Sequence, residues 1–137
     1  MLKKSTLFIL LLVGTMAPFL QGCNKYSDGP ILSVVSRTER LANIWKVENY
    51  KIDGTDYTSI VTNYTEIFSK SGAYSYDWGI LGGSGTWAFQ NNDMEVKLTG
   101  NDNQTSRTLY ILKLEEKALW YYYTDNDKRH EFHLSQK

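Results

Sequence analysis

Cysteine and proline are both scarce in this chain of 137 residues, which contains one Cys and two Pro. A single Cys excludes an internal disulfide, and it excludes the clusters of Cys ligands that hold structural zinc. An excess of charge of one sign is also absent, because 15 Lys and Arg balance 15 Asp and Glu. The chain therefore lacks the basic footprint of a nucleic-acid-binding protein, and we expect no nucleic-acid partner.

Residues suited to catalysis or metal binding are few. The only two histidines, His130 and His133, lie close together near the carboxyl terminus. Residues three apart on a strand point to opposite faces, so these two rings cannot converge on one zinc ion. The position of both histidines beside the carboxyl terminus also argues against a Ser-His-Asp triad. Asp125-Asn126-Asp127 matches only part of a calcium loop. We therefore predict a protein that is not an enzyme, with no catalytic residues, no metal site and no cofactor.

The amino-terminal apolar run, residues 7–13, is too short for a membrane span. A bilayer core of about 30 Å requires about 20 apolar residues, whereas Pro18 follows this run closely. Lys3 and Lys4 precede it, which is the order of the positive and apolar regions of a secretory signal. We predict that residues 1–22 are a cleaved signal peptide.

The only cysteine stands directly after this apolar segment, in Leu20-Gln21-Gly22-Cys23. These four residues resemble the lipobox of bacterial lipoproteins. The resemblance implies cleavage before Cys23 and lipid attachment to it, and several acyl chains would hold the protein on a membrane. By analogy with enterobacterial lipoproteins, Asn24 favours the outer membrane of the cell envelope, facing the periplasm or the outside. Residues 23–35 would then be a lipid-anchored tether.

The remainder of the chain, residues 36–137, has the pattern of an all-β domain. Ser36 and Glu39 have the spacing of a capping box, which predicts a short helix over residues 38–43. β-Branched and aromatic runs then recur at intervals of about ten residues, with connectors too short for crossover helices. Closure would remove the two exposed edges of such a meander. We predict an eight-stranded antiparallel up-and-down barrel with strands at residues 45–52, 64–69, 73–78, 85–90, 94–99, 107–114, 118–124 and 130–134.

Alternation of apolar and polar residues identifies the buried face of most strands. Met94, Val96 and Leu98 share one face of their strand, and charged residues occupy the other. Residues 109–112 and 119–123 are apolar or aromatic on both faces. We expect these two strands to be covered on both sides, with the short helix packed outside the barrel as the cover and a partner or membrane surface as the alternative.

Residues 79–85 are rich in glycine but lack the Gly-Lys-Ser/Thr ending of a phosphate-binding loop. We interpret them as a mobile hairpin loop. Ile80 and Leu81 at its tip would be exposed apolar residues that contact a membrane, ligand or partner. The alternative is a loop folded over the mouth of the barrel.

Several short segments of residues 36–137 have a recognisable pattern: the leading short helix and residues 41–47, 52–54, 68–74, 85–89 and 119–124. In these segments the chain resembles the lipocalin-like domains of Bacteroidetes lipoproteins. The resemblance implies a small lipocalin-like barrel that binds a hydrophobic or aromatic small molecule.

Aromatic residues make up 14% of the chain and supply the candidate binding site. If the alternation holds, seven of them point inward and form apolar walls with hydroxyl groups, typical of a small-molecule pocket. A barrel of this size either is packed by its own side chains or holds one small ligand. The alternative is therefore a packed interaction module that contacts an envelope protein or glycan through Trp120, Tyr122 or the Ile80-Leu81 loop. The seven candidate ligand-binding residues are Tyr74, Tyr76, Trp78, Trp87, Tyr110, Tyr121 and Tyr123.

Overall fold

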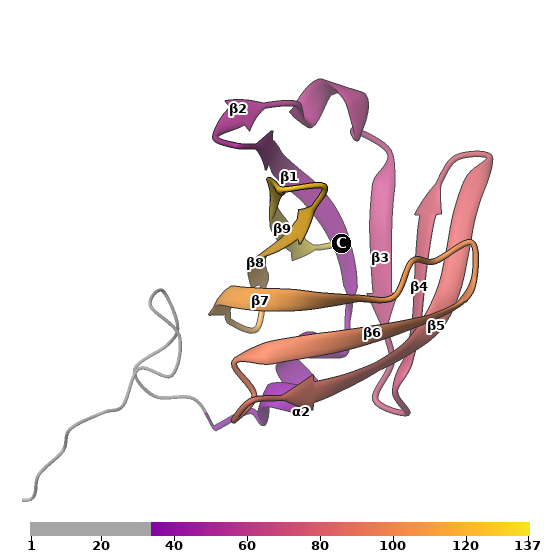
Figure 1. Cartoon of the computed structure of the whole chain (residues 1–137). Helices are drawn as coiled ribbons and strands as arrows, with labels where there is room; N and C mark the ends of the chain where they lie inside the picture. The colour runs from indigo at the N-terminus through magenta and orange to yellow at the C-terminus, as the bar shows by residue number, and fades with distance from the viewer. Residues whose placement is uncertain (1–33) are drawn as a thin grey trace, which may run out of the picture.

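The computed structural model of the protein describes residues 34–137 (Figure 1). The expected signal peptide, Cys23 and the tether up to residue 33 lie outside the described residues. Within residues 34–137, two short helices and nine strands follow one another: α2 (Arg37–Leu41), β1 (Ile44–Ile52), β2 (Thr55–Asp56), η1 (Thr58–Ile60), β3 (Tyr64–Phe68), β4 (Ala73–Trp78), β5 (Leu81–Gln90), β6 (Glu95–Asp102), β7 (Arg107–Leu114), β8 (Ala118–Asp125) and β9 (Lys128–Gln136).

The strands form one closed antiparallel sheet. Its order is β2-β1-β3-β4-β5-β6-β7-β8-β9, and β1 also pairs with β9 from Trp45↔Gln136 to Ile52↔His130. β2 pairs with β1 alone and has two residues, so it lies outside the closed ring. The predicted fold class, an all-β, lipocalin-like up-and-down barrel of eight strands with a short amino-terminal helix, is confirmed, and β2 is an addition to it.

The capping box that predicted the helix is present. The Glu39 backbone N–H donates to Ser36 Oγ over 3.2 Å, and the Ser36 backbone N–H donates to Glu39 Oε2 over 3.3 Å. The helix runs from Arg37 to Leu41, so it begins one residue earlier and ends two residues earlier than expected. In the part of the chain that the structure describes, no helix is both long and apolar enough to span a membrane.

Helix α2 lies at one end of the barrel, opposite β2 and η1 (Figure 1). Arg40 Nη1 donates to the Leu114 carbonyl over 3.0 Å, and the indole Nε1 of Trp45 donates to the Leu41 carbonyl over 2.9 Å. Both Leu41 and Trp45 are fully buried. These contacts join the helix to β1 and β7 and close this end of the barrel.

Cross-strand stacking covers the outer faces of β7 and β8. The expectation that the helix covers them is wrong, because α2 lies at the end of the barrel. Aromatic rings on neighbouring strands stack in pairs, and the aliphatic stems of cationic residues place a charge over each pair. The pairs are Tyr110 with Tyr122, at 4.9 Å between centroids and with Arg129 over Tyr122, and Trp120 with His133, at 4.0 Å and with Lys113 over Trp120.

Most of the glycine-rich segment, residues 81–85, belongs to β5, so the prediction of a mobile loop over residues 79–85 is wrong in extent although the hairpin is present. Only Gly79 and Ile80 separate β4 from β5, and Gly79 has a φ of 68° that suits a residue without a Cβ. A Cβ at Gly85 would overlap the Thr99 carbonyl oxygen of β6. The glycine there allows close backbone approach between strands. Ile80 and Leu81 are exposed, as expected for the tip of this hairpin.

Candidate functional site

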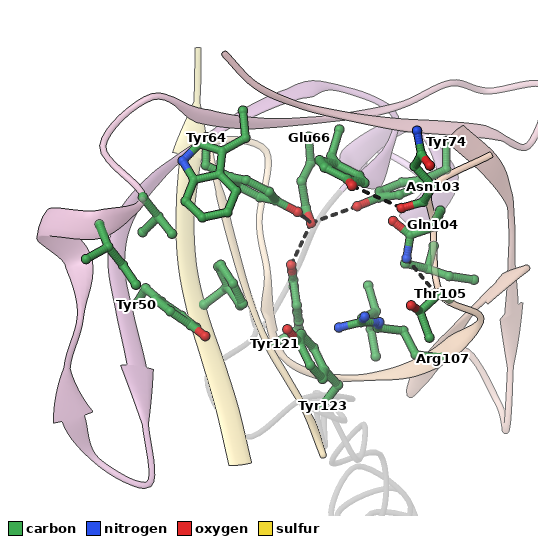
Figure 2. Close-up of a pocket in the computed structure, with 17 residues that line it drawn as sticks. Tyr50, Tyr64, Glu66, Tyr74, Asn103, Gln104, Thr105, Arg107, Tyr121 and Tyr123 are labelled. Atoms are coloured by element: carbon green, nitrogen blue, oxygen red, sulfur yellow. Dashed lines mark hydrogen bonds between the residues drawn. The ribbon is translucent and has the colours of Figure 1, made fainter. Parts of the chain in front are cut away.

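The barrel interior holds a cavity of about 300 Å³ (Figure 2). Its lining includes Ile60 of η1, which lies at the end of the barrel opposite α2 (Figure 1). Its rim includes Ile60 and Trp78, which are 55% and 37% exposed, so the cavity is accessible from solvent. The volume lies at the lower end of the range for small-molecule sites. Backbone and side chains of the β6–β7 loop, residues 103–105, form part of the wall.

A buried carboxyl group, Glu66 of β3, stands at the centre of the site. Its Oε1 accepts hydrogen bonds from the hydroxyls of Tyr64 (2.8 Å), Tyr74 (2.9 Å) and Tyr121 (2.7 Å). The three bonds converge on one oxygen in Figure 2. Tyr121 comes from β8, and its ring therefore reaches across the barrel interior to β3. Glu66 is 2% exposed.

The second carboxyl oxygen of Glu66 has no partner. Oε2 is buried, and no hydrogen-bond donor within residues 34–137 reaches it. Burial raises the pKa of the Glu66 carboxyl, whereas the three tyrosine hydrogen bonds and the Arg107 charge act in the opposite direction. A buried polar atom without a partner costs free energy and marks a place for water or a ligand.

The tyrosine hydroxyls around Glu66 remain protonated and act as donors. Burial and the neighbouring carboxyl raise the pKa of Tyr64 and Tyr121 well above the ordinary value, and the same two causes raise that of Tyr74. Their single protons are all directed at Glu66 Oε1. The hydroxyl cluster is therefore fixed in place, and the carboxyl group cannot turn without breaking three hydrogen bonds.

A cation, Arg107 at the start of β7, lines the same cavity. Its guanidinium carbon lies 4.1 Å from the centroid of the Tyr123 ring. Its Nε is buried and has no partner, and Arg107 forms no salt bridge within residues 34–137. Figure 2 shows Glu66 and Arg107 directed toward the same space. The cavity therefore contains an acid and a base that do not neutralise each other directly.

Five of the seven candidate ligand-binding residues line the cavity. Tyr74 and Tyr121 are almost fully buried and bind Glu66, and Tyr76 donates its hydroxyl to the Asn103 carbonyl over 3.0 Å. Trp78 lies at the rim, and Tyr123 lies beneath Arg107. These rings narrow the interior without filling it. Whether they bind a ligand stays a prediction.

Trp87 and Tyr110 lie elsewhere. Trp87 is buried among Phe68 and Phe89, and its indole Nε1 donates to the Ser69 carbonyl over 2.9 Å. Neither Trp87 nor Tyr110 is among the residues that line the cavity. Tyr110 is 38% exposed and stacks on Tyr122 outside the barrel, so the inward orientation expected for it is wrong.

The error at Tyr110 has a local cause. The neighbouring residues Leu109 and Ile111 are 1% and 5% exposed and occupy the inward positions of β7. Because both faces of this strand are apolar or aromatic, the alternation did not reveal which face is internal. Tyr110 is outward because it lies between these two residues.

Sequence reasoning missed Glu66 and Arg107, although each carried a signal. Glu66 lies between Tyr64 and Phe68 on one face of β3, so a carboxyl group shares an aromatic face. Arg107 shares its face with Leu109. A charged residue in phase with apolar neighbours is a departure from the pattern of a core strand and indicates a buried polar site.

The two histidines lie on different sides of the sheet. His130 Nδ1 lies 2.7 Å from the Tyr50 hydroxyl, and the ring stacks on Tyr123 at 4.9 Å. His133 Nε2 lies 2.8 Å from Glu131 Oε1 and stacks on Trp120 outside the barrel. Burial lowers the pKa of His130. Among residues 34–137, no group of three His, Cys, Asp or Glu side chains could hold a metal ion.

The chain was also compared with known proteins. A scan of its sequence against protein-family models found no match, and a search of curated proteins found no similar sequence. The site is therefore described by its own geometry: an aromatic cavity with one buried carboxyl group and one guanidinium group, each with an unpartnered polar atom.

Proposed function

We propose that the barrel binds one small molecule, largely aromatic or apolar, in its interior cavity. The observation that carries the proposal is the pair of buried polar atoms, Glu66 Oε2 and Arg107 Nε, left without partners beside a cavity of about 300 Å³. Each unmet buried group opposes folding, and a ligand that paired with both atoms would remove this cost. Binding without catalysis and without a cofactor is the function that we propose.

The same proposal places the protein in the cell envelope. The support is the order of charged residues, apolar run and Leu20-Gln21-Gly22-Cys23 at the amino terminus. Lipid on Cys23 would anchor the barrel to a membrane, and the outer membrane is the proposed location. The chain would then act as a tethered carrier or sensor of its ligand.

An interaction module is the less well supported alternative. Contact with an envelope protein or glycan through Trp120 and Tyr122 would require free aromatic faces. His133 and Tyr110 stack on these rings, and Lys113 and Arg129 lie over them. Such a partner would have to displace interactions that already cover both rings.

Substitution of Cys23 tests the anchor. We expect Cys23→Ala to move the protein from the membrane fraction to the soluble fraction or to leave an uncleaved precursor, because the thiol that takes the lipid is gone. Fractionation and the mass of the product from the full-length gene measure this. Unchanged membrane partition together with an unchanged mass would contradict the anchor.

A bulky side chain at the cavity wall tests the binding site. Thr105 is exposed and lines the cavity, so Thr105→Trp should obstruct it and lower the affinity for 3-methylindole by about tenfold or more. The full chain in lipid nanodiscs would be titrated by calorimetry, with empty nanodiscs as the blank.

The matched control for this test is Thr124→Trp, which adds the same side chain at an exposed position that does not line the cavity. We expect this variant to bind 3-methylindole like the unmodified protein. The proposal is wrong if none of 3-methylindole, indole-3-acetate and 1-naphthaleneacetate binds, or if Thr105→Trp and Thr124→Trp bind 3-methylindole equally.

A further inference from the structure

We infer that the ligand is an aromatic acid that also carries an N–H or O–H donor, with its acidic group on Arg107 and its donor on Glu66 Oε2. The inference rests on the proposed binding function and specifies the chemical class of the ligand. Its basis is the arrangement of a carboxyl group and a guanidinium group, each with one unpartnered polar atom, among the aromatic walls of the cavity.

Glu66 accepts one more hydrogen bond, and the protein supplies no donor for it. All three hydroxyls of Tyr64, Tyr74 and Tyr121 are committed to Oε1. Oε2 is buried and lacks a partner, and the hydroxyl cluster holds the carboxyl group in one orientation. A donor from a bound molecule would complete the hydrogen bonding of the carboxylate and stabilise its charged form against burial.

The guanidinium of Arg107 lies over the Tyr123 ring. The distance of 4.1 Å from the guanidinium carbon to the ring centroid is that of a cation–π contact. This contact leaves the buried Nε of Arg107 without an acceptor. A carboxylate matches the planar arrangement of guanidinium donors better than a neutral acceptor does.

The two charges together narrow the class of ligand. An acid without a donor would satisfy Arg107 but would leave Glu66 Oε2 without a partner. An amine without an acid would satisfy Glu66 but would leave Arg107 without an acceptor. A molecule that carries both groups completes both hydrogen-bonding sites, which neither of these alternatives does.

The walls of the cavity favour a flat body between the two polar groups. Phe132 lies between tyrosine rings, with Tyr64 tilted against it at 5.8 Å and Tyr123 stacked on it at 6.1 Å between centroids. All three rings line the cavity. A volume of about 300 Å³ suits one ring system of one or two rings rather than a long acyl chain.

Three bicyclic probes separate the contribution of the acidic group of the ligand from that of its N–H donor. Indole-3-acetate carries an acid and a ring N–H, 1-naphthaleneacetate carries the acid alone, and 3-methylindole carries the N–H alone. Each would be titrated by calorimetry into the full chain in nanodiscs. We expect indole-3-acetate to bind at least about tenfold more tightly than either of the others, because hydrogen bonds to charged groups are strong.

Two substitutions test whether Arg107 binds the acidic group and whether Glu66 binds the donor. Arg107→Met keeps an apolar stem over Tyr123 but removes the positive charge. This variant should bind indole-3-acetate and 3-methylindole with about equal affinity. Glu66→Gln keeps an oxygen for the tyrosines but can place an amide donor where Oε2 lies. It should abolish the preference for indole-3-acetate over 1-naphthaleneacetate.

The outcomes distinguish the inference from the proposed function. Binding of 3-methylindole or 1-naphthaleneacetate as tight as that of indole-3-acetate would overturn the inference and leave a small-molecule site. The inference would also be overturned if correctly folded Arg107→Met still preferred indole-3-acetate over 3-methylindole. The same holds if correctly folded Glu66→Gln still preferred indole-3-acetate over 1-naphthaleneacetate. Failure of all three probes to bind would overturn the proposed function together with the inference.

Discussion

Replacement of Glu66 by leucine is expected to lower the free energy of unfolding by about 3 kcal/mol or more. The carboxyl group is the common acceptor of the Tyr64, Tyr74 and Tyr121 hydroxyls, and all three bonds are 2.7–2.9 Å long. Each buried donor left without an acceptor costs about 1–3 kcal/mol. Removal of a buried carboxyl offsets part of this loss. Urea denaturation followed by tryptophan fluorescence measures the change.

Two variants serve as controls for this prediction. Glu116→Leu places the same apolar side chain at an exposed position and should change the free energy of unfolding by no more than about 0.5 kcal/mol. Glu66→Gln retains an acceptor oxygen for the tyrosines and should lose less stability than Glu66→Leu. A Glu66→Leu loss no larger than that of Glu116→Leu would show that the hydroxyl cluster finds other acceptors.

The difference in the free energy of unfolding between Glu66→Gln and the unmodified protein should also change with pH, in a direction that the pKa of Glu66 determines. Burial raises the pKa of Glu66 above its ordinary value of 4.5, so the native state holds the proton more tightly than the unfolded chain. Glu66 therefore lowers stability as the pH rises through the interval between its unfolded and folded pKa values. The stability of Glu66→Gln relative to the unmodified protein should rise across this interval and level off above it. A constant difference would contradict the raised pKa.

Replacement of Trp45 by alanine is expected to lower the free energy of unfolding by about 4 kcal/mol. Trp45 is fully buried, and its indole donates to the Leu41 carbonyl at the end of α2. The substitution removes a large core side chain and the hydrogen bond that ties the helix to β1. Urea denaturation measures the loss, and hydrogen exchange should show reduced protection of the α2 amides.

The control for Trp45 is Trp120, which lies on the outer side of the sheet. Trp120 is partly exposed and stacks on His133, so Trp120→Ala should cost clearly less than Trp45→Ala. Trp45→Phe separates the two contributions, because it keeps most of the ring volume and removes the donor. Equal losses for Trp45→Ala and Trp120→Ala would contradict the assignment of Trp45 to the core.

Local pattern was sufficient for the barrel. Val96 and Leu98 are 0% and 1% exposed, as their alternation with charged residues predicted. Short connectors permitted only antiparallel neighbours, and closure between β1 and β9 removed the free edges. The capping box of Ser36 located the start of the helix to within one residue. Each of these features depends on residues that are close in the sequence.

Local pattern failed where both faces of a strand look alike or where composition misleads. Tyr110 was placed inside because β7 has apolar residues on both faces, and the covering of its outer face depends on Tyr122 in the next strand. The glycines of β5 suggested mobility, whereas Gly85 provides space for the β6 backbone at Thr99. In both cases the deciding neighbour belongs to another strand.

The eight-stranded barrel and the inward-facing aromatic residues of most strands follow from the sequence alone, as does the motif around Cys23, because periodicity and motifs are local properties. The polar centre of the cavity depends instead on contacts between distant strands. Tyr121 and Glu66 are 55 residues apart, and they meet because closure of the sheet leaves only β9 and β1 between β8 and β3. Alternation predicts that a side chain points inward. The contacts among inward side chains depend on the order, register and curvature of all eight strands.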